Sequence, residues 1–148
     1  MIIRKMCFED CREISVIEKN SFSKPWSYDS FVNELKNNHA FYLVAEDAGK
    51  IAGYVGVHNI CGEAEITMIC VDEKMRGRGI GSTLLEKLIE NEVTEGINII
   101  NLEVRESNSN AISMYKKFGF VKNGLRINYY EAPKENAVLM SLNLKEGE

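Results

Sequence analysis

The sequence lacks several features that mark specialised classes of protein. Its longest apolar runs, such as residues 40–45, are far shorter than the ~20 residues that a membrane-spanning helix needs, and its first ten residues show no signal-peptide pattern. Basic residues do not predominate either, because 18 Lys and Arg stand against 22 Asp and Glu, a formal net charge of −4, whereas nucleic-acid-binding domains are basic overall. We therefore expect a cytoplasmic protein with neither a membrane nor a nucleic acid as partner.

Potential metal ligands are also scarce. The two histidines, His39 and His58, are isolated, and the four cysteines show no zinc-finger spacing. We therefore expect no metal cofactor. Without an export signal the thiols are expected to be reduced, and Cys70, which lies in an apolar run, to act as a small hydrophobe.

The chain has the size and composition of one globular domain, with 148 residues of which 45% are hydrophobic and 27% charged. Neither a repeat nor a linker divides it, so we expect a single domain over residues 1–148. The spacing of apolar residues predicts a short first strand, a helix ending near Phe22, and a second helix capped by Ser27. Strands follow near 41–46, 51–58, 63–71, 97–104, 120–130 and 136–144, with helices after the glycines at 77–81 and from Asn108 to Phe118. This order, β-α-α-β-β-β-α-β-α-β-β, predicts an α+β fold.

The strongest local signal is R-G-R-G-I-G at residues 76–81, between a predicted strand and an apolar-faced helix. A helix N-terminus presents unpaired amides, and glycines let its backbone approach a phosphate closely. Arg76 and Arg78 add positive charge on the same side. The spacing fits neither a Walker A loop, since no lysine follows Gly81, nor the G-x-G-x-x-G of dinucleotide-binding domains. A simple turn would need neither three glycines nor two arginines, so a phosphate site of another kind is favoured.

Glu103 lies near the end of an otherwise apolar predicted strand. Alternation places Ile100, Leu102 and Val104 on one face of this strand and Glu103 on the other. A carboxylate that is partly withdrawn from water has a raised pKa, which suits a general base. The spacing equally allows a solvated glutamate paired with Arg105 or a lysine.

Tyr115 shares a helix face with Ile112, which by itself indicates a core aromatic residue. Chemistry offers a second interpretation, because a thiol has a pKa of about 8.5 and a tyrosine about 10. The hydroxyl can therefore protonate or hydrogen-bond a departing thiolate. Asn108, at the start of the same helix, can cap it and still reach a ligand that lies against the preceding helix.

These motifs together resemble those of the GCN5-related N-acetyltransferases. Arg76-x-x-Gly79-x-Gly81 is similar to the family's [QR]-x-x-G-x-[GA] loop, which cradles the pyrophosphate of acetyl-CoA, and the order of elements resembles the family's fold over nearly the whole chain. The resemblance implies a central mixed, mostly antiparallel sheet flanked by about four helices, and acetyl-CoA as co-substrate. The residues that it implies in contact with acetyl-CoA are Ile69, Cys70, Val71, Arg76, Gly77, Arg78, Gly79, Ile80, Gly81, Ser82 and Asn108.

A narrower resemblance is to the ribosomal-protein alanine N-acetyltransferases within that family. It lies in L-E-V-R followed by S-N-x-x-A-I-x-x-Y-x-x-x-G-F, in K-P-W-S at 24–27 and in R-I-N-Y-Y at 126–130. It implies that Glu103 is the proton acceptor and Tyr115 the proton donor. The residues that would shape the peptide slot are Trp26, Tyr129 and Tyr130. The sequence departs from the relatives at Met68, where they commonly carry an asparagine.

The implied reaction is direct transfer of an acetyl group from acetyl-CoA to a protein N-terminal α-amine, with the N-terminal alanine of a ribosomal protein as the expected acceptor. An α-amine has a pKa of about 7.7–8.0, against about 10.4 for lysine, so one carboxylate can remove its proton near neutral pH. The Val71 N–H at the end of its strand would stabilise the oxyanion. A covalent route through Cys70 lacks an activating histidine beside it in the sequence.

Two other functions remain open at the level of the sequence. The first keeps the fold but takes a lysine, a polyamine or another small-molecule amine as acceptor. The second is a non-catalytic acyl-CoA sensor, which would bind coenzyme A without turnover.

Overall fold

The computed structural model describes residues 1–145. Its elements follow the predicted order, and most of their ends lie within two residues of the predicted ones. They are β1 (Ile2–Lys5), η1 (Phe8–Asp10), α1 (Cys11–Ser21), α2 (Tyr28–Leu35), β2 (Ala40–Asp47), β3 (Lys50–Ile60), β4 (Glu63–Val71), η2 (Glu73–Met75), α3 (Ile80–Thr94), β5 (Ile99–Arg105), α4 (Ser109–Lys117), β6 (Val121–Glu131) and β7 (Lys134–Asn143).

The seven strands form one sheet in the order β1-β2-β3-β4-β5-β7-β6. Every neighbouring pair is antiparallel except β4 and β5, which are parallel. The predicted mixed, mostly antiparallel sheet with four α-helices is therefore confirmed. Over the part of the chain that the structure describes, none of the helices combines the length and apolarity needed to cross a membrane.

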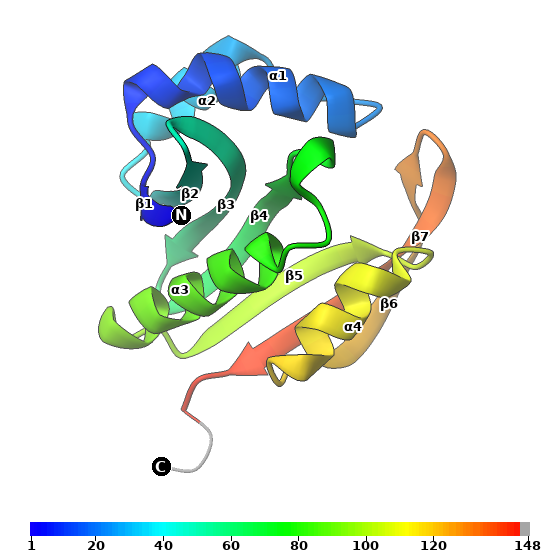
Figure 1. Ribbon diagram of the computed structural model, residues 1–148. Coiled ribbons are helices and arrows are strands. Elements are labelled where there is room, and N and C mark those ends of the chain that lie inside the picture. The colour runs from blue at the N-terminus through cyan, green and yellow to red at the C-terminus, as the bar shows by residue number, and fades with distance from the viewer. Residues whose placement is uncertain (146–148) are drawn as a thin grey trace.

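The sheet separates two apolar clusters. Along β2, Leu43 and Ala45 pack in the cluster that includes α3, whereas Tyr42 and Val44 pack in the cluster that includes α1 and α2. Successive side chains of a strand point to opposite faces, so a strand that is covered on both faces is apolar at every position. This explains the continuous apolar run at residues 40–45. In Figure 1, α1 and α2 cover the N-terminal part of the sheet, and α3 and α4 lie on the viewer's side of it.

Capping residues define the starts of α2 and α4 as the sequence predicts, and a glycine follows α3. The Ser27 hydroxyl accepts the Ser30 N–H at 3.2 Å at the start of α2, and the Asn108 Oδ1 accepts the Ala111 N–H at 3.2 Å at the start of α4. Gly96, with φ +75°, follows the last residues of α3. Because left-handed backbone costs glycine little, this residue ends the helix without strain.

The strands β4 and β5 pair over residues 63–65 and 99–101. Beyond this short parallel segment they diverge, as Figure 1 shows for the green β4 and the yellow-green β5. The rest of β5 pairs on its other edge with β7, as far as Arg105 opposite Ala137. The divergence leaves the C-terminal half of β4 bonded to β3 on one edge and facing β5 on the other.

Candidate active site

The peptide groups at the end of β4 point toward the divergence from β5. The Asp72 N–H donates to the Ala52 carbonyl at 2.8 Å on the β3 side. Because hydrogen-bonding direction alternates along an antiparallel pair, the peptide groups of Val71 and Ile69 face away from β3. The Arg76 Nε donates to the Val71 carbonyl at 3.2 Å, in agreement with this direction. The Val71 N–H thus points away from β3, toward the side on which β5 diverges.

The predicted glycine cluster forms the turn that leads from η2 into α3. Gly77 and Gly79 have φ values of +79° and +77°, and a Cβ at either position would meet no atom of the described chain within 4 Å. Conformation rather than crowding therefore requires glycine at both positions. The space beside the turn is open, as a ligand-binding loop requires.

The N-terminus of α3 differs from those of α2 and α4. Its N-cap residue, Gly79, has no side chain to cap the helix, and the first turn holds no acidic residue. The Thr83 N–H donates to the Gly79 carbonyl at 3.0 Å and so makes the first hydrogen bond of the helix ladder. The amides of Ile80, Gly81 and Ser82 precede it, and such amides with the helix dipole form an anion site. The Ile80 side chain is buried in the core. This residue can therefore contact a ligand through its backbone and not through its side chain.

The Cys70 side chain points to the face of the sheet that α1 and α2 cover. Its side chain lies in the cluster under α1 and α2, and burial raises the pKa of its thiol. A thiol with a raised pKa is a poor nucleophile near neutral pH. The environment of Cys70 thus favours a packing role over a covalent one.

Glu103 lies on the face of β5 opposite to the apolar core. Ile100, Leu102 and Val104 are 0%, 2% and 6% exposed, so the predicted alternation is confirmed. The Glu103 side chain is 22% exposed, and its Oε1 lies 3.6 Å from the Arg126 Nε. The partner of this carboxylate is thus Arg126 of β6, and not Arg105 or a lysine, which the spacing leaves open as an alternative.

Two further side chains from other strands respond to the charge on Glu103. Hydrogen bonding with the Glu103 carboxylate, followed by its charge, raises the pKa of Tyr129. Burial raises the pKa of Glu65 on β4, and the charge on Glu103 adds to this shift. Glu103 therefore lies within a group of ionisable side chains that come from β4, β5 and β6.

Arg105 instead holds the β6–β7 turn (residues 132–133). Its guanidinium donates to the Pro133 carbonyl at 2.8 Å and to the Ala132 carbonyl at 3.2 Å. It also pairs with Glu135 at 3.1 Å and lies 4.3 Å from the centre of the Tyr130 ring. These four contacts draw the Arg105 guanidinium toward the β6–β7 turn at the end of β5, so it does not pair with Glu103.

Tyr115 on α4 is compatible with both interpretations of its sequence. Its side chain is 3% exposed and its ring lies 5.6 Å from that of Phe120, so it is a core aromatic residue. Burial raises the pKa of its hydroxyl, and the nearby Tyr130 adds a smaller upward shift through its charge. The hydroxyl therefore keeps its proton at neutral pH, as a proton donor must.

The predicted peptide-contacting residues come from two segments that meet. Trp26 lies in the α1–α2 loop (residues 22–27) and packs against Phe31, with ring centres 5.7 Å apart. The rings of Tyr129 and Tyr130 lie 5.1 Å apart near the end of β6. The loop and the β6–β7 turn touch, because the Ser23 hydroxyl donates to the Ala132 carbonyl. Lys24 of the loop also pairs with Glu131 at the end of β6.

Three residues of this region escaped the sequence-based prediction. Arg126 lies within the R-I-N-Y-Y motif, but nothing in the spacing indicates that its side chain reaches Glu103. Glu65 could have been found from the alternation along β4 only with the strand order in hand. Glu18, which accepts the Trp26 N–H at 3.1 Å, looks in the sequence like any glutamate of a surface helix.

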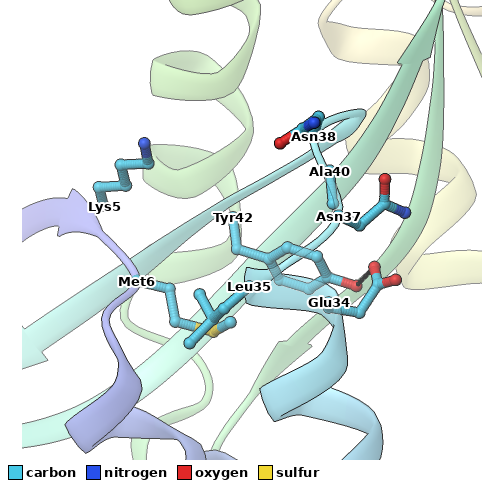
Figure 2. A pocket seen from close by; sticks show the side chains of 8 residues that line it. All are labelled: Lys5, Met6, Glu34, Leu35, Asn37, Asn38, Ala40 and Tyr42. Atoms are coloured by element: carbon cyan, nitrogen blue, oxygen red, sulfur yellow. Dashed lines mark hydrogen bonds between the residues drawn. The ribbon is translucent and has the colours of Figure 1, made fainter.

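A separate hollow of about 230 Å³ lies at the start of β2, away from these residues. Figure 2 shows the Glu34 carboxylate beside the Tyr42 hydroxyl within it. The Tyr42 hydroxyl donates to Glu34 at 2.8 Å, and the His58 Nε2 lies 2.7 Å from the same oxygen. These two contacts of the Glu34 carboxylate join α2 to β2 and β3. Across residues 1–145, no group of three or more His, Cys, Asp or Glu side chains is placed to hold a metal ion.

Comparison with known proteins gives this geometry its context. The model of the acetyltransferase (GNAT) family matches residues 8–120. A Bacillus subtilis protein provisionally named a [ribosomal protein bS18]-alanine N-acetyltransferase is 39% identical over 97% of this chain and 96% of its own. The Escherichia coli [ribosomal protein bS18]-alanine N-acetyltransferase is 32% identical over 85% of this chain and 86% of its own. A crystal structure of the ribosomal-protein-S18-alanine N-acetyltransferase from Escherichia coli superposes with a TM-score of 0.91, at 29% identity over 99% of this chain and 96% of that one.

The uncapped helix start, the glycine turn and the diverging strands thus define a class of acyl-transferring domain, and the chain belongs to the acetyltransferase (GNAT) family. Within that class it is an acetyl-CoA-dependent N-acetyltransferase.

Proposed function

We propose that the chain acetylates the N-terminal α-amine of a ribosomal protein, with alanine as the N-terminal residue. Two relatives that cover most of the chain carry names stating that they act on an alanine of ribosomal protein bS18. The structural observation that carries the proposal is the position of Glu103. Its partly exposed carboxylate lies on the open face of β5, with Arg126 and Tyr129 of β6 beside it.

The co-substrate binds at the start of α3. The amides of the first turn of α3 and the charge of Arg76 and Arg78 hold its diphosphate, and the glycines at 77 and 79 let the backbone approach. The exposed edge of β4 then aligns the thioester, whose carbonyl oxygen receives the Val71 N–H. Asn108 caps α4 on the other side. These residues bind and orient, and they leave proton transfer to others.

Proton transfer falls to Glu103 and Tyr115. Glu103 accepts a proton from the acceptor amine, either directly or through one water, and the Arg126 guanidinium at 3.6 Å orients its carboxylate. The amine nitrogen attacks the thioester carbon, the carbon–sulfur bond breaks, and the electron pair leaves with sulfur. Tyr115 donates its hydroxyl proton to that sulfur. An α-amine needs little help to lose its proton near neutral pH, so one carboxylate suffices as proton acceptor.

The acceptor is tested with a panel of amines and purified chain. The panel consists of a ribosomal-protein peptide that begins with alanine, the same peptide blocked at its α-amine but containing lysine, and spermidine. We expect one acetyl group on the unblocked peptide, located at its N-terminus by mass spectrometry, and none on the other two. Acetylation of spermidine or of the blocked peptide in place of the free N-terminus would overturn the acceptor. Binding of coenzyme A with no turnover of any amine would indicate a sensor.

A further inference from the structure

A carboxylate inside the N-terminal half of the protein connects to the α1–α2 loop. Glu18 lies on α1 and is 4% exposed. Its Oε1 accepts the Tyr54 hydroxyl proton at 2.6 Å, and its Oε2 accepts the Trp26 N–H at 3.1 Å. Both carboxylate oxygens are therefore engaged, one to the sheet and the other to the loop backbone.

The partner on the sheet is itself rigidly held. Tyr54 is fully buried on β3, directly opposite Cys70 of β4. Burial raises the pKa of its hydroxyl, so the proton stays on Tyr54 and is donated to Glu18. Cys70 precedes Val71, the last residue of β4. Glu18 is thus anchored, through the Tyr54 side chain, to the strand that pairs with the end of β4.

Aromatic packing connects Trp26 to Tyr54 as the hydrogen bonds of Glu18 do. Phe31 of α2 is fully buried, with its ring centre 6.0 Å from that of Tyr54 in an edge-on arrangement and 5.7 Å from that of Trp26. Trp26 is therefore fixed twice, through its backbone by Glu18 and through its ring by Phe31. Pro25, just before it, has no N–H to offer, so the Trp26 amide is the nearest backbone donor at this point of the loop.

The loop has two attachments of different kinds. On its outer side Ser23 and Lys24 contact the β6–β7 region through exposed groups, and the Lys24–Glu131 pair is 66% and 75% exposed. Such a pair contributes little to a fixed geometry. On its inner side the loop is held by a buried carboxylate, and hydrogen bonds to charged groups are the stronger kind. The position of Trp26 thus depends mainly on the inner attachment.

We infer that Glu18 is a positioning residue for the acceptor: through the Trp26 amide and the Tyr54 hydroxyl it sets the height of the α1–α2 loop over the end of β4. The inference rests on the proposed function, because it gives Trp26 the task of contacting the acceptor peptide. Glu18 touches neither substrate. It contributes to the binding of the acceptor. Acetyl-CoA binding and the chemical step depend on residues of α3, α4 and β5.

The test compares two substitutions on the same helix. Glu18→Gln keeps the shape but supplies one acceptor oxygen for two donors, so one of the two bonds is lost. Glu13→Gln is the matched control, because the Glu13 Oε2 also accepts a backbone N–H, that of Ile51 at 2.6 Å, at a site remote from the loop. We expect Glu18→Gln to raise the KM for the alanine peptide about tenfold, with kcat and the KM for acetyl-CoA within twofold of the wild type. Glu13→Gln is expected to leave all three unchanged.

A second readout needs no turnover. Trp26 is the single tryptophan of the chain, so its fluorescence reports on the loop alone. We expect acrylamide to quench Trp26 more strongly in Glu18→Gln than in the wild type or in Glu13→Gln. If Glu18→Gln fails to fold, Tyr54→Phe replaces it, since it frees the same carboxylate from the sheet, and is expected to move both readouts in the same direction.

The outcomes separate the two proposals. A wild-type chain that leaves the alanine peptide unmodified overturns the proposed function. A wild-type chain that acetylates the peptide, with the same peptide KM and the same quenching in both glutamine variants, overturns the positioning role alone. A fall in kcat at unchanged peptide KM in Glu18→Gln also contradicts it, because it would place Glu18 in the chemical step.

Discussion

Arg126 on β6 reaches across β7 to Glu103 on β5, with its Nε 3.6 Å from the Glu103 Oε1. The Arg126 side chain is 56% exposed and that of Glu103 22%. A pair this accessible to solvent adds little to stability. Its consequence is geometrical, since it orients a carboxylate on the open face of the sheet.

The first prediction concerns that carboxylate. Glu103→Gln removes the proton acceptor and is expected to lower kcat by about 10²–10⁴-fold, with acetyl-CoA affinity in calorimetry unchanged. It also removes the negative charge of the group whose hydrogen bond and charge raise the pKa of Tyr129, and leaves only a neutral amide oxygen as acceptor. We therefore expect the pKa of Tyr129 to fall toward that of a free tyrosine, as followed by phenolate absorbance. Glu63→Gln, which changes another carboxylate of the β4–β5 region, is the control, and equal activity in the two variants would contradict the role of Glu103.

The second prediction concerns the proton donor. Tyr115→Phe removes one hydroxyl and keeps the ring that packs against Phe120. We expect kcat to fall by at least tenfold, as the loss of a general acid implies, while the thermal midpoint and the dissociation constant of acetyl-CoA change little. Steady-state kinetics with the alanine peptide and calorimetry measure these two effects separately. An unchanged kcat would remove Tyr115 from the chemistry.

The third prediction uses the two ends of α3. Gly79 before the helix and Gly96 after it have nearly equal φ values, +77° and +75°, and at both a Cβ would meet no described atom within 4 Å. Valine at either position is expected to destabilise the fold by about 1–3 kcal/mol, the usual cost of a left-handed non-glycine residue. Gly79→Val is expected in addition to raise the KM for acetyl-CoA at least tenfold, and Gly96→Val to leave it unchanged. Equal KM values in the two variants would separate the glycine turn from acetyl-CoA binding.

The fourth prediction concerns a buried acid outside the site. Glu92 on α3 is 0% exposed, and burial raises the pKa of its carboxyl, with the Asn59 amide at 3.1 Å opposing the shift. Because the folded state holds this proton more tightly than the unfolded state, the free energy of unfolding falls as the pH rises from the ordinary glutamate pKa through the raised one. At neutral pH the buried charge of Glu92 therefore lowers the free energy of unfolding of the wild type, and a neutral glutamine at this position would not.

Glu92→Gln should accordingly raise the free energy of unfolding by about 1 kcal/mol at pH 7 and change it less at pH 4, where the acid is protonated in the folded state and largely protonated in the unfolded one. Urea denaturation at the two pH values measures the difference. Glu90→Gln, on the exposed side of the same helix, is the control and should shift stability by less than about 0.5 kcal/mol at either pH. A loss of stability at pH 7 in Glu92→Gln would show that its carboxylate is favourable in the folded state.

Features that depend on nearby residues could be predicted from the sequence. The helices were recognisable from apolar spacing, and the starts of two of them from Ser27 and Asn108, because capping involves residues within one helical turn. The face of β5 that carries Glu103 followed from a period of two. The glycine turn was recognisable because its conformation is set by its own residues.

The tertiary structure decided what joins distant parts of the chain. The sequence could not show that β7 lies between β5 and β6, and so could not pair Glu103 with Arg126 in place of its near neighbour Arg105. Nor could it show the contact of Ser23 with Ala132, 109 positions away, or distinguish the buried carboxylate of Glu18 from one in solvent. The sequence by itself determined which segments become helices and strands and which residue types carry acyl-transfer chemistry. The packing of those segments alone determined which charges meet, because partners across a sheet depend on strand order and register, which local patterns do not encode.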